Sequence, residues 1–66
     1  MGVEQGVREF IEKESTKSFS YEDKSKIAKK LALKESTVGW ALWNLARRGI
    51  IKKRKEGGRT YFQAKQ

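Results

Sequence analysis

The sequence predicts a small α+β fold, a bundle of three helices followed by a C-terminal β-hairpin. Two amphipathic stretches separated by a short turn occupy residues 27 to 51, and a lysine- and arginine-rich segment with a Gly57-Gly58 turn follows directly. With 66 residues the chain has the length of a single domain, so we expect one folded unit over residues 1 to 66.

The first predicted helix covers residues 3 to 14. Its apolar residues recur at helical spacing and form one stripe: Val3, Val7, Phe10 and Ile11. Most other positions are charged, as is usual for a helix that covers a core with one face. We therefore expect a structural role for this helix.

The second predicted helix covers about residues 20 to 32, with its start between residues 20 and 25. Ser20 is suited to cap it, because its hydroxyl can accept a hydrogen bond from an early amide, and Ser25 is an alternative start. Its apolar side is formed by Ile27, Ala28 and Leu31. The segment before it, around Phe19, is either a loop or a very short strand.

The third predicted helix covers residues 35 to 48, after a turn in which Leu33 is expected to point inward. One side of this helix gathers the apolar residues Val38, Ala41, Leu42 and Leu45. The other side gathers Ser36, Trp40, Trp43 and Arg47. Gly49 is expected to end the helix, because glycine adopts the left-handed conformation of a C-terminal cap without a steric clash.

The last predicted element is a hairpin over residues 50 to 64. If Gly57-Gly58 is a two-residue loop, Ile51 lies opposite Ala64 and Lys53 lies opposite Phe62. The face with the apolar residues is expected to cover the helices. The residues expected to face outward are Lys52, Arg54, Arg59 and Tyr61.

Charge is distributed unevenly along the chain, whose net charge is +8. Residues 1 to 23 hold three basic and six acidic side chains, whereas residues 24 to 66 hold thirteen basic and two acidic ones. A surface that is charged only for solubility would mix the two signs. The segregation therefore predicts a polyanionic partner.

Several function classes lack the residues they need. Cysteine and histidine are absent, which removes disulfides, thiolate and imidazole chemistry and the usual zinc ligands. The acidic pair Glu22-Asp23 is explained by helix capping, and no glycine-rich phosphate loop is present. We expect no enzymatic activity, cofactor, metal or small-molecule ligand, and a soluble cytoplasmic protein associated with DNA and not with a membrane.

A resemblance extends over most of the chain. The stretch Ile27-Ala28-Lys29-Lys30-Leu31-Ala32-Leu33, then Ser36-Thr37-Val38, Leu42, Leu45 and Gly49-Ile50-Ile51, is similar to the helix-turn-helix core of winged helix-turn-helix proteins. Gly57-Gly58-Arg59 resembles the tip of their wing. The resemblance implies that the third helix enters the major groove of duplex DNA, lysines of the second helix touch phosphates, and the wing reaches an adjacent backbone or minor groove.

Carried over position by position, the resemblance implies a set of DNA-binding residues. They are Lys29, Lys30, Ser36, Thr37, Trp40, Trp43, Asn44, Arg47, Lys53, Lys55 and Arg59. Gly39 is also expected on the groove-facing side. Two departures from the family pattern are Lys34, where a capping Ser or Thr is usual, and the Gly39-Trp40 pair with Trp43, where polar or basic readers are common.

These observations predict a DNA-binding protein. Its role would be that of a small transcriptional regulator or of a chromatin- or virus-associated protein. Sequence discrimination should be modest, because only Asn44 and Arg47 on the third helix can make bidentate base contacts. The alternative is an interaction module in which Trp40 and Trp43 anchor a partner protein or a second copy of the chain. The sequence leaves open whether each indole is core, a nucleic-acid contact or part of a protein interface.

Overall fold

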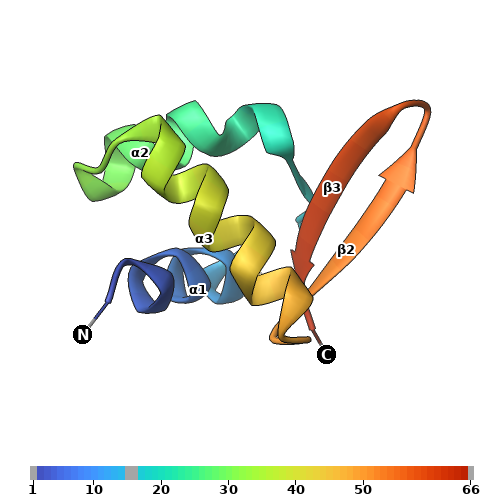
Figure 1. Ribbon diagram of the computed structural model, residues 1–66, viewed down its shortest axis with the longest axis horizontal. Coiled ribbons are helices and arrows are strands. Elements are labelled where there is room, and N and C mark those ends of the chain that lie inside the picture. The colour runs from blue at the N-terminus through green and yellow to red at the C-terminus, as the bar shows by residue number, and fades with distance from the viewer. Residues whose placement is uncertain (1, 15–16, 66) are drawn as a thin grey trace.

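The computed structural model describes residues 2–14 and 17–65 of the chain. Within them it has an α+β architecture of three α-helices and a three-stranded antiparallel sheet (Figure 1). The elements in chain order are α1 (Val3–Lys13), β1 (Phe19–Ser20), a 3-10 turn (Tyr21–Asp23), α2 (Lys24–Leu31), α3 (Glu35–Arg47), β2 (Ile51–Glu56) and β3 (Arg59–Ala64). The predicted order of three helices followed by a hairpin is confirmed.

The start of the second helix, at Lys24, lies within the predicted range of residues 20 to 25. Ser20 does begin the turn, and its backbone N–H donates to Asp23 Oδ2 at 3.1 Å. This contact closes a tight 3-10 turn, so that α2 begins only at Lys24 and not at Ser20. The acidic pair Glu22-Asp23 thus lies in the turn ahead of α2, where the Asp23 carboxylate accepts the hydrogen bond from the backbone N–H of Ser20.

A left-handed residue ends α2. Ala32 has φ 56° and ψ 45°, a conformation that glycine adopts more easily than alanine. The next amide, that of Leu33, donates to the carbonyl of Ala28 at 2.8 Å and closes the helix end. Leu33 then packs against the hydrophobic core, as the sequence predicted.

The sheet has the strand order β1-β3-β2. The predicted hairpin register is confirmed, with Ile51 opposite Ala64 and Lys53 opposite Phe62. Of the two alternatives for the segment around Phe19, the strand is correct, because Phe19 pairs with Phe62. The two glycines of the loop have positive φ angles of 54° and 80°, which suits a hairpin turn of the type that requires φ > 0 at both central positions.

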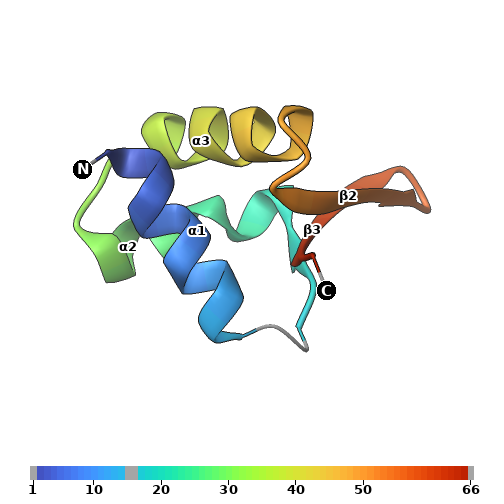
Figure 2. The same cartoon turned by 90° about the horizontal axis from the view of Figure 1, so that it is seen from below.

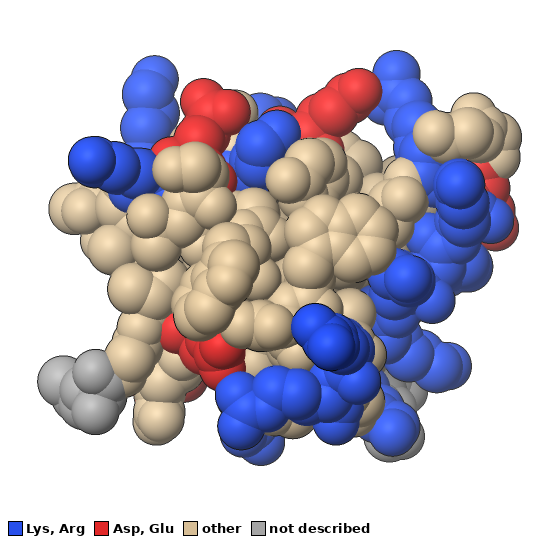
Figure 3. Space-filling model, viewed as in Figure 1, with Lys and Arg blue, Asp and Glu red and all other residues tan. Residues whose placement is uncertain are grey.

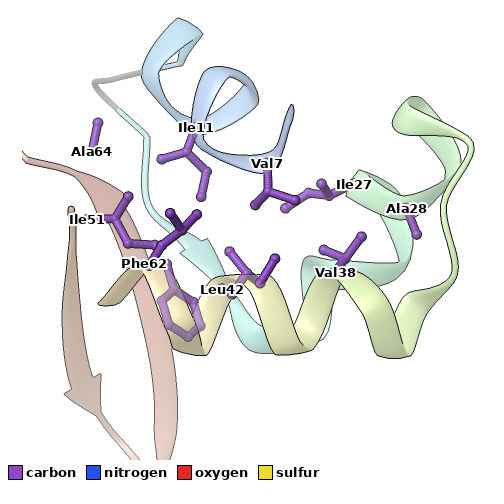
Figure 4. Packing of buried hydrophobic residues seen from close by; sticks show 11 residues of the cluster. Val7, Ile11, Ile27, Ala28, Val38, Leu42, Ile51, Phe62 and Ala64 are labelled. Atoms are coloured by element: carbon purple, nitrogen blue, oxygen red, sulfur yellow. The ribbon is translucent and has the colours of Figure 1, made fainter. Parts of the chain in front are cut away.

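The core lies where α1, α2 and α3 meet the base of the sheet (Figure 4). Phe62 is the largest fully buried side chain and reaches from β3 toward α3. The other members of the buried cluster are Val7, Ile11, Ile27, Ala28, Val38, Ala41, Leu42, Leu45, Ile51 and Ala64. In the part of the chain that the structure describes, every helix is too short or too polar to cross a membrane.

Candidate nucleic-acid interface

The outward side of α3 carries the two most exposed large apolar side chains of the described residues. Trp40 is 58% exposed and Trp43 is 40% exposed. Ser36 and Arg47 are exposed on the same helix, and Thr37 is half-buried. α3 therefore presents indoles, hydroxyls and one guanidinium to solvent, as its periodicity predicts.

Trp43 is held in place by aromatic neighbours from distant parts of the chain. Its ring lies 5.6 Å from the ring of Phe62 at an interplanar angle of 89°, and 5.7 Å from the ring of Tyr21. The ammonium group of Lys53 lies 4.8 Å from its ring centroid. Trp43 thus connects α3 with the 3-10 turn and the hairpin, which gives it a structural role in addition to its exposed edge.

Trp40 has a different environment. No aromatic ring or cation contacts it among the described residues, and more than half of it is open to solvent. An exposed indole without partners costs hydration free energy that burial against a ligand would recover. Of the two indoles, Trp40 is the one available to a partner.

Gly39 does not face a ligand, contrary to the expectation from the resemblance. It is buried, and a Cβ atom at this position would lie 2.8 Å from Oη of Tyr21 and 3.3 Å from Cδ of Lys24. The missing side chain lets Tyr21 pack directly on α3. The ammonium group of Lys24 in turn lies 4.3 Å from the Tyr21 ring centroid. No local sequence pattern indicates this packing of Tyr21 and Lys24 on α3, because it joins residues far apart in the chain.

A hollow between α3 and β2 brings five of the predicted residues together. Its volume is about 450 Å³, and it is lined by Trp40, Trp43, Asn44, Ala46, Arg47 and Lys53. The lining contains two cations and no carboxylate. In Figure 3, Lys and Arg side chains gather over the hairpin and beside the C-terminal end of α3, around an uncharged centre.

Lys53 and Lys55 share the face of the hairpin that holds Ile51 and Phe62, because side chains alternate along a strand. Both lysines are exposed. We call the set formed by Ser36, Thr37, Trp40, Trp43, Arg47, Lys53 and Lys55 the α3–hairpin surface.

Asn44 is engaged within the protein. Its Nδ2 donates to Oε2 of Glu4 at 3.0 Å, and the other carboxylate oxygen of Glu4 accepts a hydrogen bond from Arg48. Asn44 thus links α3 to α1, although it also lines the hollow. One Nδ2 hydrogen of Asn44 is therefore committed to Glu4, while its second Nδ2 hydrogen and Oδ1 remain for other contacts.

Arg59 stands at the hairpin loop and forms an ion pair with Glu22, with Nη1 and Oε1 3.4 Å apart. Both side chains are well exposed, 60% for Arg59 and 70% for Glu22. Exposed pairs of this kind contribute only about 0–1 kcal/mol, so a phosphate can compete for the guanidinium.

Lys29 and Lys30 lie elsewhere. They line a second hollow together with Phe10 of α1 and Phe19 of β1, and this hollow shares no lining residue with the first. Figure 2 shows the C-terminal end of α1 on the side of the molecule away from α3. The structure therefore separates these two lysines from the other predicted site residues.

Neither family models nor curated proteins nor solved structures match this chain. Among the described residues, no group of three His, Cys, Asp or Glu side chains is arranged to hold a metal ion. Function is therefore inferred from the order of the elements and the chemistry of the surfaces.

Proposed function

We propose that this chain is a winged-helix domain that binds duplex DNA, with α3 as the recognition helix and the β2–β3 hairpin as the wing. The observation that carries the proposal is the hollow between α3 and β2, where Arg47 and Lys53 flank two indoles and no carboxylate is present. An uncompensated positive surface beside an exposed helix suits a duplex, whose phosphates lie on both sides of the major groove.

Each part of the α3–hairpin surface has a role in this proposal. Ser36 and Thr37, at the N-terminal end of α3, donate hydrogen bonds to phosphates or base edges. Trp40 contacts apolar base edges such as the thymine methyl group. Lys53 and Lys55 hold the backbone of the strand beside the groove, and Arg59 at the hairpin loop extends this contact to a further phosphate.

Sequence discrimination should be modest. One Nδ2 hydrogen of Asn44 is bound to Glu4, which ties this amide to α1 and leaves Arg47 as the freer of the two side chains on α3 that can make a bidentate contact with a base. Most of the binding free energy then comes from phosphates. A small transcriptional regulator or a chromatin- or virus-associated protein would suit this balance.

Titration of a duplex at several salt concentrations, followed by tryptophan fluorescence, tests the proposal. Lys53, Lys55 and Arg59 together should neutralise about three phosphates, so log K should fall with log salt at a slope of about −2.7. Quenching of the fluorescence is expected because the exposed Trp40 belongs to the α3–hairpin surface. Absence of binding at low salt would refute the proposal.

A charge-matched pair of variants sharpens this test. The double variant Lys53→Gln/Lys55→Gln should weaken binding by roughly ten- to a hundredfold at about 0.1 M salt, since two phosphate contacts are lost. Lys29→Gln/Lys30→Gln removes the same charge from the other hollow and should weaken binding much less. Equal loss in both would mean that net charge, and not this surface, determines affinity.

The exposure of Trp40 favours a second candidate function. At 58% exposure and without a ring or cation partner among the described residues, this indole could anchor a partner protein or a second copy of the chain. Such binding would bury Trp40 but depend little on salt. Sedimentation equilibrium of the protein alone, compared with that of Trp40→Ala, would reveal self-association.

A further inference from the structure

The second hollow lies between α2, β1 and the C-terminal half of α1, and we call it the α2 hollow. It has a volume of about 590 Å³ and is lined by Phe10, Lys17, Ser18, Phe19, Asp23, Lys26, Ile27, Lys29 and Lys30. Its volume falls within the range of about 300–1,000 Å³ that is usual for ligand sites. None of the residues around it is used in the proposed contact with DNA.

The floor of the α2 hollow is apolar. The rings of Phe10 and Phe19 lie 5.5 Å apart and are both half-buried, and they pack against the core beside the fully buried Ile27. Two tilted, half-buried rings can accept a third aromatic or a branched aliphatic side chain. The floor is thus suited to one large apolar group.

The rim of the α2 hollow is strongly positive. It contains four lysines and one carboxylate, and Oδ2 of that carboxylate, Asp23, already accepts the N–H of Ser20. Lys17 has an ion pair with Glu14 at 3.5 Å. The other three lysines have no carboxylate partner among the residues described.

Two of these lysines destabilise α2 by mutual repulsion. Lys26 and Lys30 stand four positions apart on an eight-residue helix, and like charges at this spacing destabilise a helix by roughly 0.2–0.5 kcal/mol. An acidic ligand would remove this repulsion. A positive rim around an apolar floor therefore matches a ligand that combines carboxylates with one apolar group.

We propose that the α2 hollow docks an acidic peptide segment of a partner protein. One large apolar side chain of the segment inserts against Phe10 and Phe19, while neighbouring carboxylates pair with Lys26, Lys29 and Lys30. A peptide suits the hollow better than a small molecule does, because its lysines are exposed and an enclosed site would bury about 70–90% of a small ligand. Since the two hollows share no residue, peptide and DNA can bind together.

The proposal is tested with a fluorescein-labelled synthetic peptide in which one phenylalanine is flanked on each side by three acidic residues. We expect saturable binding by fluorescence polarisation. Replacing the phenylalanine of the peptide with serine should weaken binding by about tenfold or more, because burial of the ring is lost. Equal binding of the two peptides would overturn the proposal, since attraction between charges alone would then explain the result.

The two double variants of the DNA experiment also test this site, with the variant expected to lose binding and the control exchanged. Lys29→Gln/Lys30→Gln should weaken peptide binding about three- to tenfold, and Lys53→Gln/Lys55→Gln, with the same net charge, should leave it unchanged. Both pairs are exposed, and a midpoint of thermal unfolding that is unchanged, or slightly raised where Lys30→Gln removes the repulsion from Lys26, would confirm that the variants fold. Equal weakening by both pairs would contradict the site.

Nuclear magnetic resonance locates the peptide. Amide signals of Phe19, Ile27 and Lys30 should shift on binding, whereas the indole signals of Trp40 and Trp43 should not. The opposite pattern would overturn the inference.

Discussion

The α3–hairpin surface and the α2 hollow both combine lysines with aromatic rings, but they do so in opposite arrangements. On the α3–hairpin surface the rings protrude, with Trp40 58% exposed, and a lysine lies against Trp43. In the α2 hollow the rings of Phe10 and Phe19 form the floor and the lysines stand around the rim.

The two regions also differ in how they are assembled. Tyr21, Trp43, Lys53 and Phe62 come from four segments and touch one another, so the α3–hairpin surface exists only when the whole chain is folded. The unpaired lysines of the α2 hollow all lie on one helix. We therefore expect core mutations to disrupt the first region and charge mutations on α2 to leave the fold intact.

The largest effect is expected for Phe62→Ala. Phe62 is fully buried and supports both Trp43 and Tyr21, so the change should cost about 3–5 kcal/mol of unfolding free energy. Urea denaturation followed by circular dichroism measures this loss. A small change in stability, with the position of Trp43 retained, would show that the aromatic cluster does not hold the α3–hairpin surface together.

The next largest effect is a difference in stability between the variants of the two tryptophans. Trp43→Ala should lower the unfolding free energy by about 2–3 kcal/mol, because its ring contacts two other rings, whereas Trp40→Ala should cost under about 1 kcal/mol. In DNA binding Trp40→Ala should cost about 1 kcal/mol or more, measured on the folded variant, because its contact with apolar base edges is lost. If Trp40→Ala destabilises the fold as much as Trp43→Ala does, Trp40 also supports the fold. The assignment of Trp43 as the structural indole and of Trp40 as the one available to a partner would then be wrong.

A smaller effect is expected for Gly39→Ala. Alanine favours a helix by about 1 kcal/mol over glycine, but the new Cβ would lie 2.8 Å from Oη of Tyr21 and displace its ring. We expect a net loss of about 1 kcal/mol in thermal unfolding, together with a change in the fluorescence of Trp43. A net gain in stability would show that Tyr21 moves away from α3 at little cost.

The smallest effect, and a stabilising one, is expected for Ala32→Gly. Ala32 has a positive φ of 56°, so glycine should relieve about 0.5–1 kcal/mol of strain at the end of α2. A rise in the midpoint of thermal unfolding checks this. As a control, Ala28→Gly in the interior of α2 should instead lower the midpoint. A lower midpoint in both variants would mean that the left-handed end of α2 is not strained.

Much of the fold could be predicted from local patterns. The apolar stripe of α1 is Val3, Val7, Phe10 and Ile11, and α1 begins and ends within one residue of the predicted bounds. The Gly57-Gly58 loop predicted the hairpin register correctly. The start of α2 was predicted only as a range, residues 20 to 25, and within this range the contact of Asp23 with Ser20 makes the first residues a 3-10 turn.

The candidate site was predictable only in part. Periodicity alone places Trp40, Trp43 and Arg47 on one side of α3. It could not show that Asn44 is bound to Glu4, forty positions earlier in the chain, or that Tyr21 covers Gly39. Each of these contacts depends on how two elements are placed relative to each other.

The sequence by itself determined which segments form helices and strands, how the hairpin strands pair, and where positive charge is concentrated. These properties depend on neighbours within a few residues, where periodicity and turn chemistry act. The tertiary structure decided which aromatic rings support others and which remain free, and it divided the lysines between two surfaces. That division depends on long-range packing around Phe62 and α3, which no local pattern specifies.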